Sequence, residues 1–405
     1  MEKNKLRKDF FWNIIGTSLN AFNSLFFMII ATRINGINDA GIFTFAFTCA
    51  TVFYVIGVYA GRIYEVTDLT NKNDMDFIIS KTVTCFVMLL ISIIFIIINR
   101  YSLYKSLIIL LLCILKMFEA FSETTYAIIQ KRDYLYKVGI SFTIKSIMCL
   151  LSFLIVDLLT KNLLYSLITM NIIYILIYIF FDFPIIKKLK ITKTFKYENV
   201  KSILTNGFLA FLLAFLTSFV INSPKYVIDY TLEEKYQTIY SILVMPASVI
   251  FLFTQFIIHP FLNKITNFIK DKDYEKVKDI VKKFSISMFA FGIFAIVIAY
   301  FIGIPFLNFI YNINLLKYKS CLIIVLIGAL FYGISSILSS ILMAMRKFNI
   351  QIAIYSITSI LSIILNYFLI KIMNMGVNGA CISYTIITIL IYFLFTIVSN
   401  KKFNS

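Results

Sequence analysis

Charged side chains are rare in this sequence, and ionisable groups inside its long apolar stretches are energetically expensive, so four of them are the first candidates for chemistry. Lys116, Glu119 and Glu123 follow one another at positions i, i+3 and i+7. At about 100° per residue, a helix places these three side chains in one narrow stripe. Such a stripe must face protein or water, where it can form ion pairs, bind a charged ligand or carry a proton or sodium ion.

Lys145 is the fourth of these side chains and lies in the next apolar stretch along the chain. Counted from the predicted helix ends, Lys145 and Glu123 lie at nearly the same depth, roughly 9 Å from one membrane face. We therefore expect a Glu123–Lys145 ion pair between adjacent helices and a Lys116–Glu119 pair along one helix. Two interpretations stay open: the four charges only neutralise each other between packed helices, or they line a transport cavity.

An anionic ligand would need further cations, because these four charges sum to zero. Arg62 ends the second apolar stretch, one turn before Glu65. Lys225 follows Ser223-Pro224, a pair that predicts a helix break after the seventh stretch. Both cations are candidates for contact with a ligand, and each can instead be an interfacial residue whose head group reaches water.

The elements that must position these side chains are membrane helices. Of the 405 residues, 60% are hydrophobic and 14% are charged, against about 25% charged in soluble domains. Apolar runs of about 20 residues recur along the chain, as transmembrane helices require. The connections between them are too short for a separate soluble catalytic domain. We predict 12 spans, at 10–32, 40–61, 78–98, 106–129, 138–157, 163–183, 202–222, 236–262, 284–304, 319–345, 350–371 and 377–398.

The distribution of Lys and Arg predicts the orientation of the chain. Counted over alternate connections from the N-terminal tail, 26 of the 38 basic residues fall on one side of the membrane and nine on the other. The positive-inside rule then places both termini in the cytoplasm. The same bias accounts for most of the net charge of +18, so no nucleic-acid partner is predicted.

Signatures of enzymes and metal sites are not found in the sequence. His259 is the only histidine and stands beside Pro260, which favours a structural role and excludes a histidine-rich metal site. The six cysteines are scattered singly through apolar spans, and no Gly-rich phosphate loop occurs. We therefore predict that the protein is not an enzyme and has no cofactor and no metal site.

The predicted spans divide into two sets of six. The basic segment 184–201 separates an N-terminal bundle, 1–183, from a C-terminal bundle, 202–405. Six spans in each half give both halves the same orientation, as in parallel repeats about an axis along the membrane normal.

A weak internal repeat supports this division. Aligning Arg132 with Arg346 matches several apolar positions of the fifth and eleventh spans. It also places Ser359 where the first half has Lys145. Charged side chains inside the membrane are therefore expected mainly in the first half.

The last two spans carry a motif that resembles a known family. Ser362-Ile-Ile-Leu-Asn366 is followed, after an apolar run, by Gly376-Val-Asn-Gly-Ala-Cys-Ile-Ser-Tyr-Thr385. This resembles polysaccharide repeat-unit flippases of the Wzx type, in the superfamily that also contains multidrug and toxic-compound exporters and lipid II flippases. Gly61-Arg62 and Asn222-Ser-Pro-Lys add to the resemblance, whereas Lys371 stands where the family often has proline.

The resemblance implies an all-α polytopic protein of the bacterial cytoplasmic membrane, with two six-helix bundles forming a V around a central cavity that opens to each side in turn. It implies that the protein moves an undecaprenyl-pyrophosphate-linked oligosaccharide to the outer leaflet for surface polysaccharide synthesis. The expected substrate-facing cations are Arg62, Lys116, Lys145 and Lys225.

Glu119 and Glu123 are then expected to pair with these cations or to carry a coupling proton or sodium ion. The other expected partners are membrane lipids and polysaccharide-assembly proteins.

Three other functions are compatible with the sequence. A small-molecule or multidrug exporter of the same fold would bind a cation at Glu119 and Glu123. An integral-membrane polymerase or glycosyltransferase requires a long outward loop rich in polar residues, and the longest predicted outward connection, 222–235, holds few charges. A scaffold without transport activity would tolerate loss of the intramembrane charges.

Overall fold

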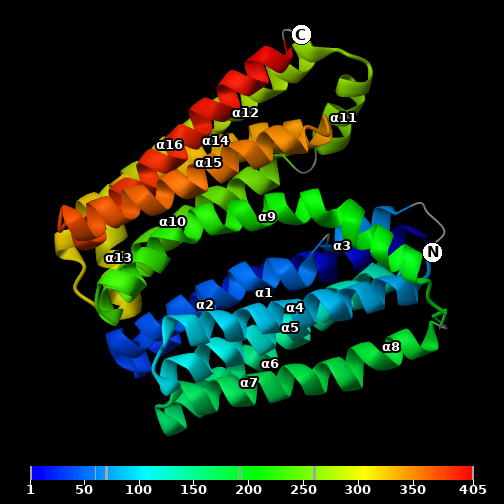
Figure 1. Cartoon of the computed structure of the whole chain (residues 1–405), viewed down its shortest axis with the longest axis horizontal. Helices are drawn as coiled ribbons and strands as arrows, with labels where there is room; N and C mark the ends of the chain where they lie inside the picture. The colour runs from blue at the N-terminus through cyan, green and yellow to red at the C-terminus, as the bar shows by residue number, and fades with distance from the viewer. Residues whose placement is uncertain are drawn as a thin grey trace. The chain divides into compact units, whose positions relative to one another are not determined.

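The computed structural model describes residues 2–59, 61–68, 72–189, 191–192, 194–258 and 261–403. Every regular element in these ranges is a helix (Figure 1). The residues form two compact units, Met1–Phe215 and Leu216–Ser405. The division between the units falls inside helix α9, beyond the segment 184–201 that the sequence analysis treats as a linker.

The first unit contains the helices that correspond to the first six predicted spans. They are α1 (Glu2–Ile34), α2 (Gly36–Val58), α3 (Gly61–Thr67), α4 (Asp74–Asn99), α5 (Leu103–Lys131), α6 (Leu135–Thr160), α7 (Leu163–Ile177), the π-helix η1 (Tyr178–Asp182) and α8 (Phe183–Lys188). The run from α7 through η1 to α8 forms one continuous span.

The second unit begins within α9 (Tyr197–Thr231) and holds the remaining helices. They are α10 (Glu234–Ile258), α11 (Leu262–Lys270), α12 (Tyr274–Ile298), the π-helix η3 (Ala299–Gly303), α13 (Ile304–Tyr311), the 3-10 helix η4 (Leu316–Tyr318), α14 (Lys319–Ala344), α15 (Phe348–Tyr367), the π-helix η5 (Phe368–Ile372) and α16 (Gly376–Phe403).

The described helices confirm a polytopic membrane protein. Within the described part of the chain, 11 helical runs are long and apolar enough to cross a membrane. α5 has 29 residues and is also long enough, but it carries the charged stripe. Apolar side chains such as Phe86 and Ile98 are largely exposed, as expected for surfaces in contact with lipid rather than water.

Helix α9 corrects the prediction for the seventh span. It continues through Pro224 to Thr231, so the predicted break at this proline is wrong and Lys225 lies inside the helix. Pro224 has no N–H to donate to the Val220 carbonyl four residues earlier. The Ser223 hydroxyl donates to that carbonyl at 2.9 Å, which replaces the missing hydrogen bond.

Helices α1 and α6 approach each other at two glycines, Gly16 and Gly139. A Cβ atom on Gly139 would collide with the backbone of Trp12 and Asn13, and one on Gly16 would collide with the backbone carbonyl of Gly139. Small residues allow membrane helices to pack at such short distances. This contact fixes α6, and therefore Lys145, relative to α1.

Asp76 ties the start of α4 to the chain just before α9. Its carboxylate accepts hydrogen bonds from the backbone N–H of Asn73 and of Lys196, both at 2.8 Å, and from the Asn199 side-chain amide at 2.7 Å. Asp76 is fully buried. The end of the basic segment is thus fixed to the first unit.

Candidate functional site

A polar cavity of about 210 Å³ lies inside the first unit, between helices α1, α2, α5, α6 and α7. Its polar lining residues are Asn20, Asn23, Ser24, Thr51, Lys116, Glu119, Lys145, Ser146 and Tyr174. The structure therefore brings three of the charged residues singled out in the sequence to one cavity. A cavity lined in this way can hold water, an ion or a polar group of a larger ligand.

Lys116 and Glu119 form the ion pair that their spacing predicts. The Lys116 Nζ atom lies 2.6 Å from Glu119 Oε2, one turn apart on α5. The Lys116 ammonium also lies 5.1 Å and 5.4 Å from the ring centres of Phe47 and Tyr54 on α2. The side chains of Lys116 and Glu119 are 15% and 20% exposed, so both charges are accessible from the cavity.

Lys145 is held by a buried polar network in place of the expected pair with Glu123. Its Nζ atom lies 2.6 Å from Asp182 Oδ2 and donates to Ser122 Oγ at 2.8 Å and to the Tyr126 hydroxyl at 2.9 Å. The predicted Glu123–Lys145 pair is wrong, because each of these charges has another partner in the structure.

Three tyrosine rings surround the Lys145 ammonium. The ring centres of Tyr174, Tyr126 and Tyr178 lie 4.3, 5.1 and 5.4 Å from Nζ. Ring faces attract cations, so these tyrosines stabilise the ammonium in a site with 3% exposure. Lys145 thus connects the cavity on one side with Asp182 on the other.

Asp182 owes its position to a local change in helix geometry. It ends the π-helix η1, where one extra residue per turn shifts the register relative to an α-helix. The second carboxylate oxygen of Asp182 accepts from the Ser141 hydroxyl at 2.7 Å, and Ser141 is 2.8 Å from the Tyr126 hydroxyl. Both carboxylate oxygens are therefore satisfied, as a buried charge requires.

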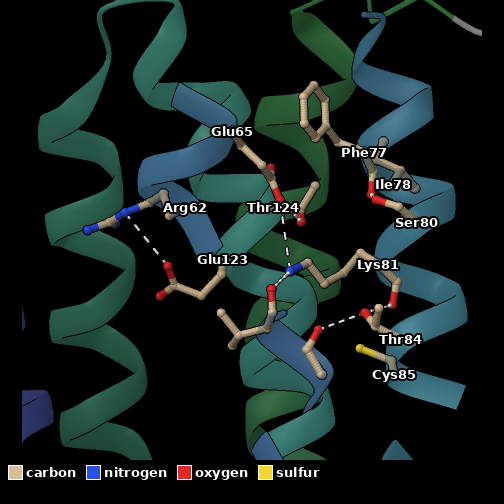
Figure 2. A network of polar contacts seen from close by, with 12 residues as sticks. Arg62, Glu65, Phe77, Ile78, Ser80, Lys81, Thr84, Cys85, Glu123 and Thr124 are labelled. Carbon is tan, nitrogen blue, oxygen red and sulfur yellow. Dashed lines mark hydrogen bonds and ion pairs between the residues drawn. The ribbon is translucent and has the colours of Figure 1, made fainter. Parts of the chain in front are cut away.

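Arg62 and Glu123 form a looser pair at the break between α2 and α3. Arg62 Nε lies 3.7 Å from Glu123 Oε2, and the two side chains are 23% and 18% exposed (Figure 2). The terminal nitrogen Nη1 of Arg62 is buried without a hydrogen-bond partner. The guanidinium thus has unused donor capacity next to a helix break.

On the other side of the same break lie three polar residues that contact one another or the end of α2: Lys81, Thr84 and Glu65 (Figure 2). α2 ends at Val58, so the carbonyls of its last turn need other partners. Lys81 Nζ donates to the Val58 carbonyl at 2.5 Å, and the Thr84 hydroxyl donates to the Gly57 carbonyl at 2.8 Å.

Glu65 completes this group from the short helix α3. Its carboxylate lies 3.8 Å from Lys81 Nζ and accepts from the Thr124 hydroxyl at 2.8 Å. Burial raises the pKa of the Glu65 carboxyl above its ordinary value, and the positive charge of Lys81 opposes this effect. The two charges are therefore held together at low exposure.

Two of the residues that build this region, Asp182 and Lys81, are not among the candidates predicted from the sequence. Asp182 is a single carboxylate within Phe180-Phe181-Asp182-Phe183, and an acid in such an apolar run signals a buried partner. Lys81 lies near the start of the apolar run of α4. The same reasoning that singled out Lys145 applies to both.

Other predicted positions are not among the residues that line the cavity, or they lie outside the described residues. Lys225 lies on α9 in the second unit. His259 lies outside the described residues. All six cysteines are buried and free of disulfides. Among the described residues, no group of three or more His, Cys, Asp or Glu side chains could hold a metal ion.

Comparison with known proteins gives one similar curated sequence and many similar structures. The capsular polysaccharide biosynthesis protein CapF of Staphylococcus aureus is 24% identical over 394 residues, which cover 94% of this chain and 95% of that protein. No protein-family profile matches the chain.

Solved structures of transporters match nearly the whole fold. An inward-facing multidrug resistance MATE family transporter of the MOP superfamily superposes with a TM-score of 0.70 at 10% identity, covering 97% of this chain and 98% of that one. The Vibrio cholerae MATE transporter VcmN, as its D35N mutant, gives 0.63 at 11% identity over 99% and 97%. A MOP superfamily transporter from Pyrococcus furiosus gives 0.60 at 10% identity over 99% and 96%.

The superposition covers the helices of both units, and the sequence similarity to CapF is also full length. The chain is therefore a multi-pass membrane protein with the fold of MOP-superfamily transporters, the fold that the resemblance of its sequence motifs implies.

Proposed function

We propose that this protein is a flippase that moves an undecaprenyl-pyrophosphate-linked oligosaccharide repeat unit across the bacterial cytoplasmic membrane for surface polysaccharide synthesis. The observation that carries the proposal is the cavity lined by Lys116, Glu119 and Lys145 inside an apolar bundle. Full-length similarity to a protein named for capsular polysaccharide biosynthesis supports the same pathway.

The chemistry of the cavity suits the polar end of such a lipid. Amide and hydroxyl groups of Asn20, Asn23 and Ser24 can exchange hydrogen bonds with sugar hydroxyls. Lys116 can form charge-assisted hydrogen bonds with phosphate oxygens, and Lys145 can do so by exchanging one of its three present hydrogen-bond partners for the phosphate. The volume of about 210 Å³ is below the ~300–1,000 Å³ of pockets for drug-sized ligands, so the cavity would take one end of a larger substrate.

Charge exchange at Lys116 offers a way to couple binding to ion movement. Its ammonium is already paired with Glu119, so an incoming phosphate would compete with that carboxylate. Glu119 would then be released to accept a proton or sodium ion. Glu123 can act in the same way if a substrate anion binds Arg62, because the Arg62–Glu123 distance of 3.7 Å is longer than the Lys116–Glu119 distance of 2.6 Å.

Alternating access would expose this cavity first to one side of the membrane and then to the other. In this proposal the bundles 1–183 and 202–405 are the two moving parts, joined by the segment 184–201, and both termini are cytoplasmic. Lys225 on α9 is the substrate-facing cation assigned to the second bundle. Proteins that extend the polymer are the expected assembly partners.

The sharpest test is Lys116→Met, with Lys105→Met as its matched control. Lys105 is also a buried lysine of α5 that lies over aromatic rings, but it is roughly 16 Å along the helix from Lys116 and does not line the cavity. Each variant is expressed in a strain that lacks the gene, and lipid-linked oligosaccharide on the cytoplasmic leaflet is quantified together with surface polysaccharide.

We expect Lys116→Met to lower surface polysaccharide about tenfold, equivalent to about 1.4 kcal/mol of lost interaction, and to cause the lipid-linked precursor to accumulate. Lys105→Met should stay close to wild type at equal protein level. Normal polysaccharide with Lys116→Met would reject the site. A deletion strain that accumulates no precursor but becomes sensitive to cationic drugs would reject the proposed substrate and favour a multidrug exporter.

A further inference from the structure

An apolar groove of about 490 Å³ lies in the second unit, between α9 and the end of α15. Aromatic rings of Tyr226, Tyr230, Tyr367 and Phe368 form much of its lining, and the rest is aliphatic, including Ile364. Tyr230 and Ile364 are 73% and 60% exposed, so the groove opens to the surface that faces lipid in a membrane helix. It is larger than the polar cavity and opposite to it in chemistry.

Both helices that line the groove have an irregular backbone next to it. Pro224 interrupts the hydrogen bonding of α9 just before Tyr226, and α15 changes into the π-helix η5 at Phe368. Next to the groove, Asn366 Nδ2 donates to Ser223 Oγ at 3.2 Å and ties the two helices together. The same Asn366 amide donates to the Ser362 carbonyl at 2.7 Å. This buried hydrogen bond joins the two helices that line the groove.

A cation, Lys371, lies beside the groove. Lys371 Nζ is 5.1 Å from the ring centre of Tyr367 and 5.5 Å from that of Tyr230, two of the rings that line the groove. Lys371 itself is exposed. An apolar groove with an exposed ammonium at its border matches a ligand that has a hydrocarbon chain and an anionic head group.

The lining favours an isoprenoid chain over a straight acyl chain. Isoleucine, valine and aromatic side chains have few accessible rotamers, so the groove is rigid. Fixing a flexible acyl chain in a rigid groove costs conformational entropy for each rotatable bond. A branched polyprenyl chain has fewer freely rotating bonds, and its methyl groups fill the spaces between rings.

We propose that this groove binds the polyprenyl chain of a phosphate-bearing lipid carrier, with Lys371 contacting its phosphate. The inference rests on the proposed function and adds a second site, in the other unit, for the apolar part of the substrate. In the orientation predicted from the Lys and Arg distribution, Lys371 lies at the outward end of its helix. The groove would then hold the carrier when its phosphate has reached the outer side.

The test measures lipid binding to the purified full-length protein by native mass spectrometry. The probes are undecaprenyl phosphate, undecaprenol and phosphatidylglycerol at equal concentrations. Ile364→Trp fills the groove, Lys371→Gln removes the cation, and Ile360→Trp is the matched control, because Ile360 is an equally exposed isoleucine one turn earlier on α15 that does not line the groove.

Saturable binding of one undecaprenyl phosphate is expected, weakened about tenfold by Ile364→Trp and by Lys371→Gln and unchanged by Ile360→Trp. Equal retention of phosphatidylglycerol would overturn the proposal by showing ordinary lipid contact. Equal binding of undecaprenol would overturn the role of Lys371. If Ile364→Trp does not fold, Lys371→Gln still decides the result, because it alters an exposed side chain.

Cellular measurements separate failure of this inference from failure of the proposed function. A deletion strain that accumulates lipid-linked precursor, together with groove variants that bind and transport normally, rejects the groove alone. A deletion strain without such a precursor rejects the proposed function, whatever the groove binds in the purified protein.

Discussion

The two units differ in the kind of polar side chain that they bury. Among residues whose burial is described, the buried charged side chains, such as Lys81, Lys145 and Asp182, lie in the first unit. The buried polar side chains of the second unit are neutral, and Asn366 is an example. At the position that the internal repeat aligns with Lys145, the second unit has Ser359, whose buried hydroxyl has no hydrogen-bond partner.

This difference suggests that the two units have different roles, ligand binding in the first and apolar packing in the second. A buried ion pair must recover a large desolvation cost, so it is weak support for stability by itself. In the first unit, the charged side chains of Lys116, Glu119 and Lys145 line a cavity, where in our proposal the two lysines bind the ligand. The second unit has no charged side chain among its described buried residues, and it carries the apolar groove between α9 and the end of α15.

The largest expected effect comes from breaking the Lys145–Asp182 pair. Asp182→Asn leaves a buried ammonium with 3% exposure and no carboxylate, which should cost about 3–5 kcal/mol of unfolding free energy. Unfolding in mixed detergent micelles can be followed by the fluorescence of Trp12, the only tryptophan. Ser359→Ala, at the aligned position of the second unit, should change the free energy by less than about 1 kcal/mol.

A double variant sharpens this result. Lys145→Met with Asp182→Leu removes both charges and should recover most of the lost stability, because apolar residues of similar volume can replace a buried pair. It should not recover transport, since the cavity loses one of its cations. A cost below about 1 kcal/mol for Asp182→Asn alone would show that the pair is not what fixes this core.

Helix packing gives the next largest contrast. Gly139→Ala places a methyl group against the backbone of α1, which cannot move aside, and should cost about 1–3 kcal/mol. In the second unit, Gly303→Ala meets mainly the end of the Leu322 side chain at 2.7 Å, and a change below about 1 kcal/mol is expected. Equal losses of unfolding free energy for the two variants would show that the close contact of α1 with α6 does not contribute more to stability than the contact at Gly303.

The sequence predicts the helices well because each span is a continuous run of about 20 mostly apolar residues. It also predicts the Lys116–Glu119 pair, since residues three apart on one helix are neighbours by geometry alone. Both statements depend only on local spacing. The fold that the chain shares with MOP-superfamily transporters could be predicted for a similar reason, because short motifs of the sequence imply it.

The partners of Lys145 and Glu123 could not be predicted in this way. Equal depth in the membrane leaves the rotation of each helix undefined, and rotation decides which side chains meet. The π-helix η1 turns Asp182 toward Lys145, and the break after α2 brings Arg62 next to Glu123. Neither irregularity can be predicted from a hydropathy profile, because neither inserts a run of polar residues or changes the length of a span. The continuation of α9 through Pro224 was missed because it depends on the Ser223 hydroxyl.

The smallest expected effect tests how the two units use hydroxyl groups between helices. In the first unit, the Thr84 hydroxyl on α4 donates to the Gly57 carbonyl at 2.8 Å, in the last turn of α2. In the second unit, the Thr385 hydroxyl on α16 donates at 2.7 Å to the Ile324 carbonyl, which lies inside the continuous helix α14. The two hydrogen bonds have nearly the same length, but only the carbonyl near the end of α2 lacks a following turn of its own helix.

Thr84→Val should therefore cost more than Thr385→Val. Losing a hydrogen bond to a buried carbonyl at a helix end costs about 1–3 kcal/mol, whereas losing a second hydrogen bond to a carbonyl inside a continuous helix costs about 0.5–1.5 kcal/mol. Valine keeps the shape of threonine, so the difference between the two variants reports on the hydrogen bond and not on packing. Unfolding free energies from Trp12 fluorescence give this difference directly. An equal or reversed order would mean that the break after α2 is stabilised by Lys81 alone, through its hydrogen bond to the Val58 carbonyl.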